Sequence, residues 1–167
     1  MTRKEKAVAI AKDVIKQIKL KRFKATQGEY VGLDIWLEAT DPKSQLQCVI
    51  ADAKCEVCAR GAMFMSSVRL FNKFKVGDFS YNDFMMPGSS VIGKYELLYL
   101  TDKQRALLEC TFEAGVYNSV DPLSPDEELA AANYSDSFTD SKSRLIGLMR
   151  NIIRNKGNFV IPKKFTK

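Results

Sequence analysis

Histidine is absent from the 167-residue chain. Without imidazole the chain cannot carry a Ser-His-Asp triad, a Cys-His pair or histidine acid–base catalysis. Zinc sites that use histidine ligands are excluded for the same reason. The glycine-rich loop motifs that bind nucleotide phosphates are missing as well. We therefore expect a protein that is not an enzyme and that uses no cofactor.

Long apolar runs are also missing. No stretch approaches the roughly 20 apolar residues of a membrane-spanning helix. The basic start of the chain is followed by Lys12, Asp13 and Lys16 instead of the apolar segment of a signal peptide. Five prolines and nine glycines are too few for a disordered chain. These absences predict a cytoplasmic protein without membrane contact, folded as a single domain over residues 1–167.

Hydrophobic periodicity predicts an all-α or nearly all-α fold. Apolar residues recur at helical spacing over residues 3–22. Residues 57–74 are apolar on nearly all sides, which is typical of a core helix. Gly61 lies inside this segment, where close packing of a neighbouring backbone is the best reason for a glycine. We expect a compact bundle of five or six helices around a buried central helix 57–74.

Local capping signals place the ends of several helices. Thr2, Thr101 and Ser124 each precede, by three residues, a Glu or Gln that completes a capping box. The last helix begins near Asp140, and Gly157 is a good left-handed terminator for it. The segments expected between these helices are a turn at 28–33, a short β element within 25–56 such as 45–50, and a short helix at 91–99.

Three segments carry a resemblance to known proteins. They are the cysteine-led helix at Cys55–Ala62, the helix around Leu107–Glu113, and the closing Arg144–Pro162 with its Asn-Lys-Gly before the proline. Together they resemble short bacterial and bacteriophage proteins of unknown function. The resemblance implies a phage or bacterial accessory role and brings no assigned catalytic residues.

Cysteine spacing suggests a metal site only in part. Cys55 and Cys58 form one CxxC pair, whereas a four-cysteine zinc site commonly has two such pairs. Cys48 and Cys110 would have to complete the site in space. Cys58 and Cys110 also fall on predicted buried faces, and free cysteine is among the most buried residue types. We favour buried thiols over a zinc site, and a thioredoxin-like redox pair lacks its βαβ context.

Positive charge is concentrated at the two ends of the chain. Residues 1–24 carry nine basic and two acidic side chains, and residues 141–167 carry eight basic and no acidic ones, within a net charge of +6. If the first and last helices pack side by side, these cations form one patch for an anionic partner. The predicted patch residues are Lys12, Lys16, Lys19, Arg150, Arg154 and Lys156.

A pocket for a small anionic, nucleotide-like ligand is an alternative site. Arg60 or Arg69 would bind the anion, and Trp36 and Tyr81 would supply aromatic walls. Glu109 and Glu113 share a helix face at the spacing of paired carboxylates. Because Arg105 precedes Glu109 by four residues, we interpret these two acids as ordinary solvated helix surface.

The sequence therefore favours a non-catalytic binding protein. We expect a protein partner first, because no helix-turn-helix, zinc-finger or RNA-recognition motif accompanies the basic residues. Association with nucleic acid through the basic terminal helices is the second hypothesis. Sequestration of a small anionic ligand is the third. The sequence sets no oligomeric state.

Overall fold

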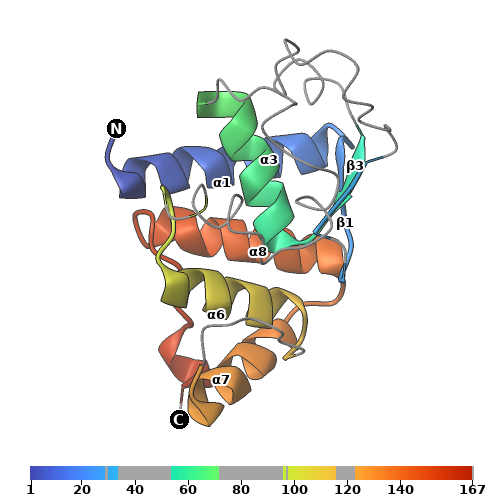
Figure 1. The fold of residues 1–167 in the computed structure, drawn as a ribbon. Coiled ribbons are helices and arrows are strands. Elements are labelled where there is room, and N and C mark those ends of the chain that lie inside the picture. Colours follow the sequence, from blue (N-terminus) through green and yellow to red (C-terminus); the bar gives the residue numbers. More distant parts are fainter. Residues whose placement is uncertain (29, 34–53, 72–95, 97, 116–122, 167) are drawn as a thin grey trace.

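The computed structural model describes residues 1–28, 30–33, 54–71, 96, 98–115 and 123–166 (Figure 1). Within these ranges most residues are helical, which confirms the mainly α-helical prediction. The described residues form five α-helices, α1 (Arg3–Lys19), α3 (Ala59–Phe71), α6 (Asp102–Phe112), α7 (Pro125–Ser135) and α8 (Ser141–Arg154), and a short 3-10 helix, η2 (Lys163–Phe165). In the described part of the chain no helix is both long and apolar enough to cross a membrane.

Helix α1 begins where its capping box predicts. The Thr2 hydroxyl accepts a hydrogen bond from the backbone N–H of Glu5, and the Glu5 carboxylate accepts one from the N–H of Thr2. The helix ends at Lys19, before the predicted residue 22. Lys21 adopts a positive φ of 57°, which turns the chain toward the first strand and stops the helix.

A small three-stranded sheet follows α1. Strand β3 (Cys55–Val57) lies in the middle, parallel to β1 (Phe23–Ala25) and antiparallel to β2 (Val31–Leu33). The predicted β element within 25–56 is therefore present, but 31–33 is a strand where the sequence indicated a turn. The central helix also begins two residues later than predicted, since Val57 belongs to β3. The proposed strand at 45–50 lies outside the described residues.

Helix α3 is buried from Ala59 to Val68 without interruption. Gly61 explains how the sheet approaches it so closely. A Cβ atom added at Gly61 would lie 1.5 Å from the carbonyl oxygen of Tyr30, just before β2. The prediction that Gly61 permits close backbone packing is confirmed.

The remaining helix starts also follow their caps. Thr101 caps α6 and Ser124 caps α7, each through a capping box, and the Asp140 carboxylate accepts the Ser143 N–H at the start of α8. Gly115 and Gly157 follow α6 and α8 with φ of 86° and 92°, as expected for helix terminators. The helix predicted at 91–99 falls mostly outside the described residues.

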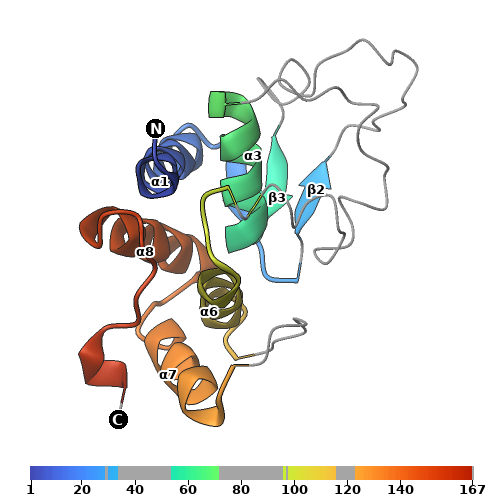
Figure 2. The same cartoon turned by 60° about the vertical axis from the view of Figure 1, so that its left-hand side comes forward.

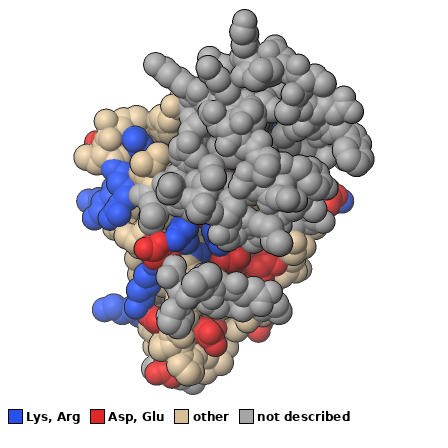
Figure 3. Space-filling view, in the orientation of Figure 1, with Lys and Arg blue, Asp and Glu red and all other residues tan. Residues whose placement is uncertain are grey.

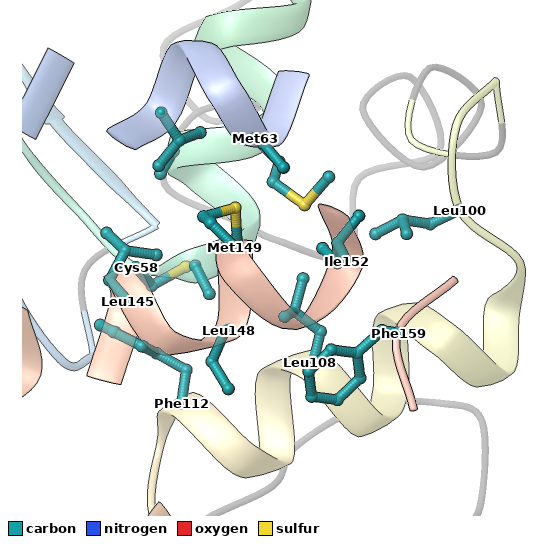
Figure 4. Close-up of a cluster of buried hydrophobic side chains, with 14 of the residues drawn as sticks. Cys58, Met63, Leu100, Leu108, Phe112, Leu145, Leu148, Met149, Ile152 and Phe159 are labelled. Carbon is teal, nitrogen blue, oxygen red and sulfur yellow. The ribbon is translucent and has the colours of Figure 1, made fainter. Parts of the chain in front are cut away.

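Helix α8 lies between α1 and α6, and α7 packs against α6 (Figures 1 and 2). Helix α3 packs on α1 and α6, β2 and β3 lie beside α3 on the side away from α1, and β1 contacts α1 and α8 (Figure 2). The core fills the space between α3, α6 and α8, where Met63, Leu108 and Met149 meet (Figure 4). Helix α3 is therefore a buried part of the core, and α8 contributes to the same core.

Candidate anion-binding interface

The first and last long helices run antiparallel, so the start of α1 meets the end of α8 (Figure 1). Gly157 marks this contact, because a Cβ atom added there would lie 2.3 Å from the carbonyl oxygen of Lys4. Glycine suits this position, since its φ of 92° and the facing backbone both disfavour a side chain. The condition for one basic patch, that the first and last long helices pack side by side, is therefore met.

All six predicted patch cations are exposed on this pair of helices. With Lys4 they make up what we term the α1–α8 face: Lys4, Lys12, Lys16, Lys19, Arg150, Arg154 and Lys156. Within the part of the chain that the structure describes, none of them lies within 4 Å of a carboxylate. Figure 3 shows Lys and Arg side chains gathered where α1 begins and α8 ends. Their charges therefore face solvent and are available to an anion.

A groove of about 510 Å³ runs between the two helices. Its apolar side chains are Val8 and Ala9 from α1 and Ile153 from α8, all partly exposed. Its charged rim carries three lysines and one glutamate: Lys4, Lys12, Lys156 and Glu5. The face thus combines a strip of apolar surface with a cationic border.

Glu5 contributes one negative charge to this border, which leaves a net charge of +2 with the three lysines. Its carboxylate accepts the Thr2 backbone N–H at 2.7 Å as part of the α1 capping box. Hydrogen bonds from the backbone and the hydroxyl of Thr2 lower the pKa of Glu5. The border is therefore cationic overall, with the Glu5 carboxylate held at the start of α1.

A second groove, of about 310 Å³, lies between α6, α7 and the chain after α8. Its apolar lining includes Leu107, Ala130 and Phe159, with Asp126 and Glu127 at the edge. Glu127 forms an ion pair with Lys103 and accepts the Ser124 N–H. This groove therefore carries less unpaired charge than the α1–α8 face.

Arg60 forms a buried network inside the molecule. Its guanidinium donates to both carboxylate oxygens of Glu96, at 3.1 and 2.6 Å, and to Glu109 at 2.6 Å. The hydroxyl of Tyr30 donates to Glu96 at 2.9 Å, and Arg105 lies 3.3 Å from the same carboxylate. Arg60 and Glu96 are only 7% and 1% exposed, so this is a true core ion pair.

The charges of this network stabilise one another. Burial opposes ionisation of Arg60, but the adjacent Glu96 carboxylate outweighs it, and the pKa of Arg60 is raised overall. Burial, and then the charge of Glu96, raise the pKa of Tyr30 well above its usual value. A buried charge without a partner is costly. The network therefore stabilises the packing of α3 against α6 and against the segment at Glu96.

The network corrects the interpretation of Glu109 and Glu113 as solvated surface. Glu109 is 14% exposed and binds Arg60, whereas Arg105 pairs with Asp102 and Glu96. Glu113 accepts the Gly28 N–H at 2.9 Å, and burial raises its pKa. One signal was present in the sequence: an arginine inside a fully apolar helix must find a carboxylate elsewhere in the chain.

The structure does not bring the two arginines of the predicted ligand pocket together. Arg60 and Arg69 are nine residues apart on α3, which places them on opposite sides of the helix, about 180° apart. Arg60 binds Glu96 and Glu109, and Arg69 lies 3.5 Å from Asp13. Trp36 and Tyr81 lie outside the described residues. Each of these two alternative arginines already lies beside a carboxylate, which an anion would have to displace.

The described cysteines are buried free thiols. Cys55 lies in β3, and the Cys58 sulfur accepts the backbone N–H of Gly61 at 3.4 Å. Cys110 is fully buried in α6. Among the residues with described positions, no three Cys, Asp or Glu side chains are placed to hold a metal ion. Cys48, the fourth member of the predicted zinc set, lies outside the described residues.

Burial makes these thiols sensitive to alkaline pH. It raises the pKa of Cys58 to about 12 and that of Cys110 to about 11. In the unfolded chain a thiol ionises near pH 8.5. Above that pH the unfolded state loses the proton first, so the free energy of unfolding should fall by about 1.4 kcal/mol per pH unit for each thiol.

Urea titrations between about pH 8.5 and pH 11 measure this effect. The Cys58→Ala variant lacks one buried thiol and should lose less stability over the same range than the parent protein. Tyr30 contributes equally to both, so the difference between the two slopes isolates the thiol. Parallel pH profiles of parent and variant would show that Cys58 titrates normally.

No protein-family model, curated protein or solved structure matches this chain. The resemblance of the cysteine-led and C-terminal helices to short phage and bacterial proteins stays a prediction. The α1–α8 face and its groove are therefore the features that bear on function.

Proposed function

We propose that this is a non-catalytic, cytoplasmic binding protein that engages an anionic macromolecular partner through the α1–α8 face. One observation carries the proposal. The α1–α8 face exposes seven cations without a described ion pair, and three of them, Lys4, Lys12 and Lys156, border an apolar groove between the two helices. Such a surface raises the local concentration of a polyanion and speeds its association. A phage or bacterial accessory role agrees with this activity.

Salt dependence is the first physical consequence. A partner held by n cations releases about that many counterions, and for duplex DNA the slope of log K against log[salt] is about −0.9 per contact. If about six cations take part, a slope near −5 follows. An acidic protein partner also loses affinity with salt, because exposed charges are screened over about 10 Å at 0.1 M.

Charge reversal on the α1–α8 face is expected to weaken this binding about 100-fold at low salt. The variant Lys12→Glu/Arg154→Glu replaces one cation on each helix and leaves the core untouched. The variant loses two attractive charges and gains two that repel the anionic partner. We expect this to reduce the binding free energy by about 2–3 kcal/mol at a protein surface. Fluorescence anisotropy with labelled polyglutamate and, separately, with a labelled DNA duplex measures the affinities.

The control variant is Lys163→Glu/Lys164→Glu. It makes the same change in net charge on η2, where both lysines are exposed and the neighbouring helix is α7. The control should retain most of the affinity. Equal losses in the two variants, or affinities that do not change with salt, would contradict a binding face on α1 and α8.

A further inference from the structure

We infer that the groove between α1 and α8 holds the apolar side of an acidic amphipathic helix from a protein partner. The inference deepens the proposed function and rests on it. It concerns the class of partner, which charge alone does not decide.

The apolar strip of the groove favours the binding of an apolar group. Val8, Ala9 and Ile153 keep part of their surface exposed between the two helices. Burying apolar surface contributes about 25 cal/mol per Å². A phosphate backbone cannot supply such contacts, whereas a leucine or isoleucine side chain can.

The length of the groove suits two turns of a helix. Its α1 side extends from Lys4 to Lys12, eight residues or about 12 Å at the rise of an α-helix. Two turns of a partner helix cover about 11 Å. Helices that bind in grooves use apolar anchors at spacings of three and four residues. Because Gly157 meets Lys4 and the two helices run antiparallel, Ile153 lies about level with Val8, and one such anchor fits between these two side chains.

The rim is complementary to acidic residues. Lys4 and Lys12 border the groove on α1, and Lys156 borders it after α8. Glu5, the carboxylate among the lining residues, is bound to Thr2. Glutamates beside the apolar anchors of the partner would therefore meet ammonium groups on both sides, and a basic partner helix would be repelled.

The lining also argues against the binding of single-stranded nucleic acid. Sequence-tolerant binding of single strands depends on aromatic side chains on which bases stack, and the lining of the groove includes no aromatic residue. The groove is lined by aliphatic side chains, lysines and one glutamate. Nucleic acid would contact the rim alone and leave the apolar strip uncovered. A protein helix uses both parts.

Two peptides and one groove-filling variant test this inference. One peptide contains leucine and glutamate with the leucines at helical spacing, and the other has the same composition in scrambled order. Ala9→Trp fills the groove and keeps every cation. We expect the ordered peptide to bind the parent about tenfold more tightly than the scrambled one, a difference of about 1.4 kcal/mol. Ala9→Trp should abolish that preference and leave polyglutamate binding unchanged.

Further variants keep the test decisive if Ala9→Trp disturbs folding. Val8→Ser removes apolar surface at a partly exposed position and should also reduce the preference for the ordered peptide. Asn133→Trp adds the same indole on the exposed side of α7 and should have no effect. Circular dichroism checks that each variant is folded.

The outcomes separate the inference from the proposed function. Equal binding of ordered and scrambled peptides, unchanged by Ala9→Trp, overturns the groove inference and leaves anion binding in place. Tight duplex binding without peptide preference also overturns it, in favour of nucleic acid. If polyglutamate, peptides and duplex all fail to bind at low salt, the proposed function itself is wrong.

Discussion

Replacing Arg60 by methionine is expected to lower the free energy of unfolding by about 3–5 kcal/mol, the cost of leaving a buried carboxylate without its partner. Glu96 is 1% exposed and would lose two hydrogen bonds, and Glu109 would lose one. Arg105 remains 3.3 Å from Glu96, but this single, longer contact cannot replace the bidentate ion pair between Arg60 and Glu96. Urea unfolding followed by circular dichroism measures the loss.

Two comparisons make this prediction specific. The double variant Arg60→Met/Glu96→Leu removes both members of the pair and should regain part of the lost stability, because no unpaired charge remains at Glu96. Lys24→Met breaks the exposed pair with Glu56, whose side chains are 74% and 42% exposed, and should cost less than about 1 kcal/mol. An Arg60→Met variant as stable as Lys24→Met would contradict the role assigned to the network.

Gly61→Ala is expected to cost about 3 kcal/mol, at the upper end of the range for overpacking a core. The added Cβ would lie 1.5 Å from the carbonyl oxygen of Tyr30 and 2.6 Å from its carbonyl carbon. These are backbone atoms, so relief requires α3 and the chain before β2 to move apart. The same movement would disturb the hydrogen bond from Tyr30 to Glu96.

Gly147→Ala is the matched comparison, since it also places a Cβ inside a helix. Its close neighbour is the ring of Phe138, at 2.1 Å, which is a partly exposed side chain that can rotate away. Alanine also favours a helix over glycine by about 1 kcal/mol. The change at Gly147 should therefore be small. Thermal unfolding of both variants checks the contrast, and similar losses at the two positions would refute it.

Helix starts could be predicted from the sequence because capping is local. Thr2, Thr101 and Ser124 each act on residues within three positions of themselves. Gly61 was predictable for a related reason, since a glycine inside an apolar helix needs a packing explanation. These features depend on neighbours along the chain, which a sequence displays directly.

The sheet could not be predicted in detail, because its pairing is long-range. Strands of three residues show too little alternation to be distinguished from turns. Phe23 pairs with Cys55, 32 positions further on, and Val31 pairs with Val57. Val57 was therefore assigned to the helix that follows it, and 31–33 to a turn.

The candidate site was predicted in part. Charge at both chain ends indicated one basic patch, and the packing of α1 on α8 brings those segments together. The groove was missed, although Val8 and Ala9 are apolar residues outside the core-facing stripe of α1. The partners of Arg60 were missed because they lie 36 and 49 positions away.

Mapping the bound surface by NMR tests the central claim most directly. Amide spectra of isotope-labelled protein would be recorded during titration with polyglutamate at low salt. We predict that the shifts concentrate on α1 and α8, at Ala9, Lys12, Ile153 and Lys156, and disappear at high salt. Shifts concentrated at the groove beside α7, around Ala130, would contradict the assignment of the α1–α8 face as the binding site.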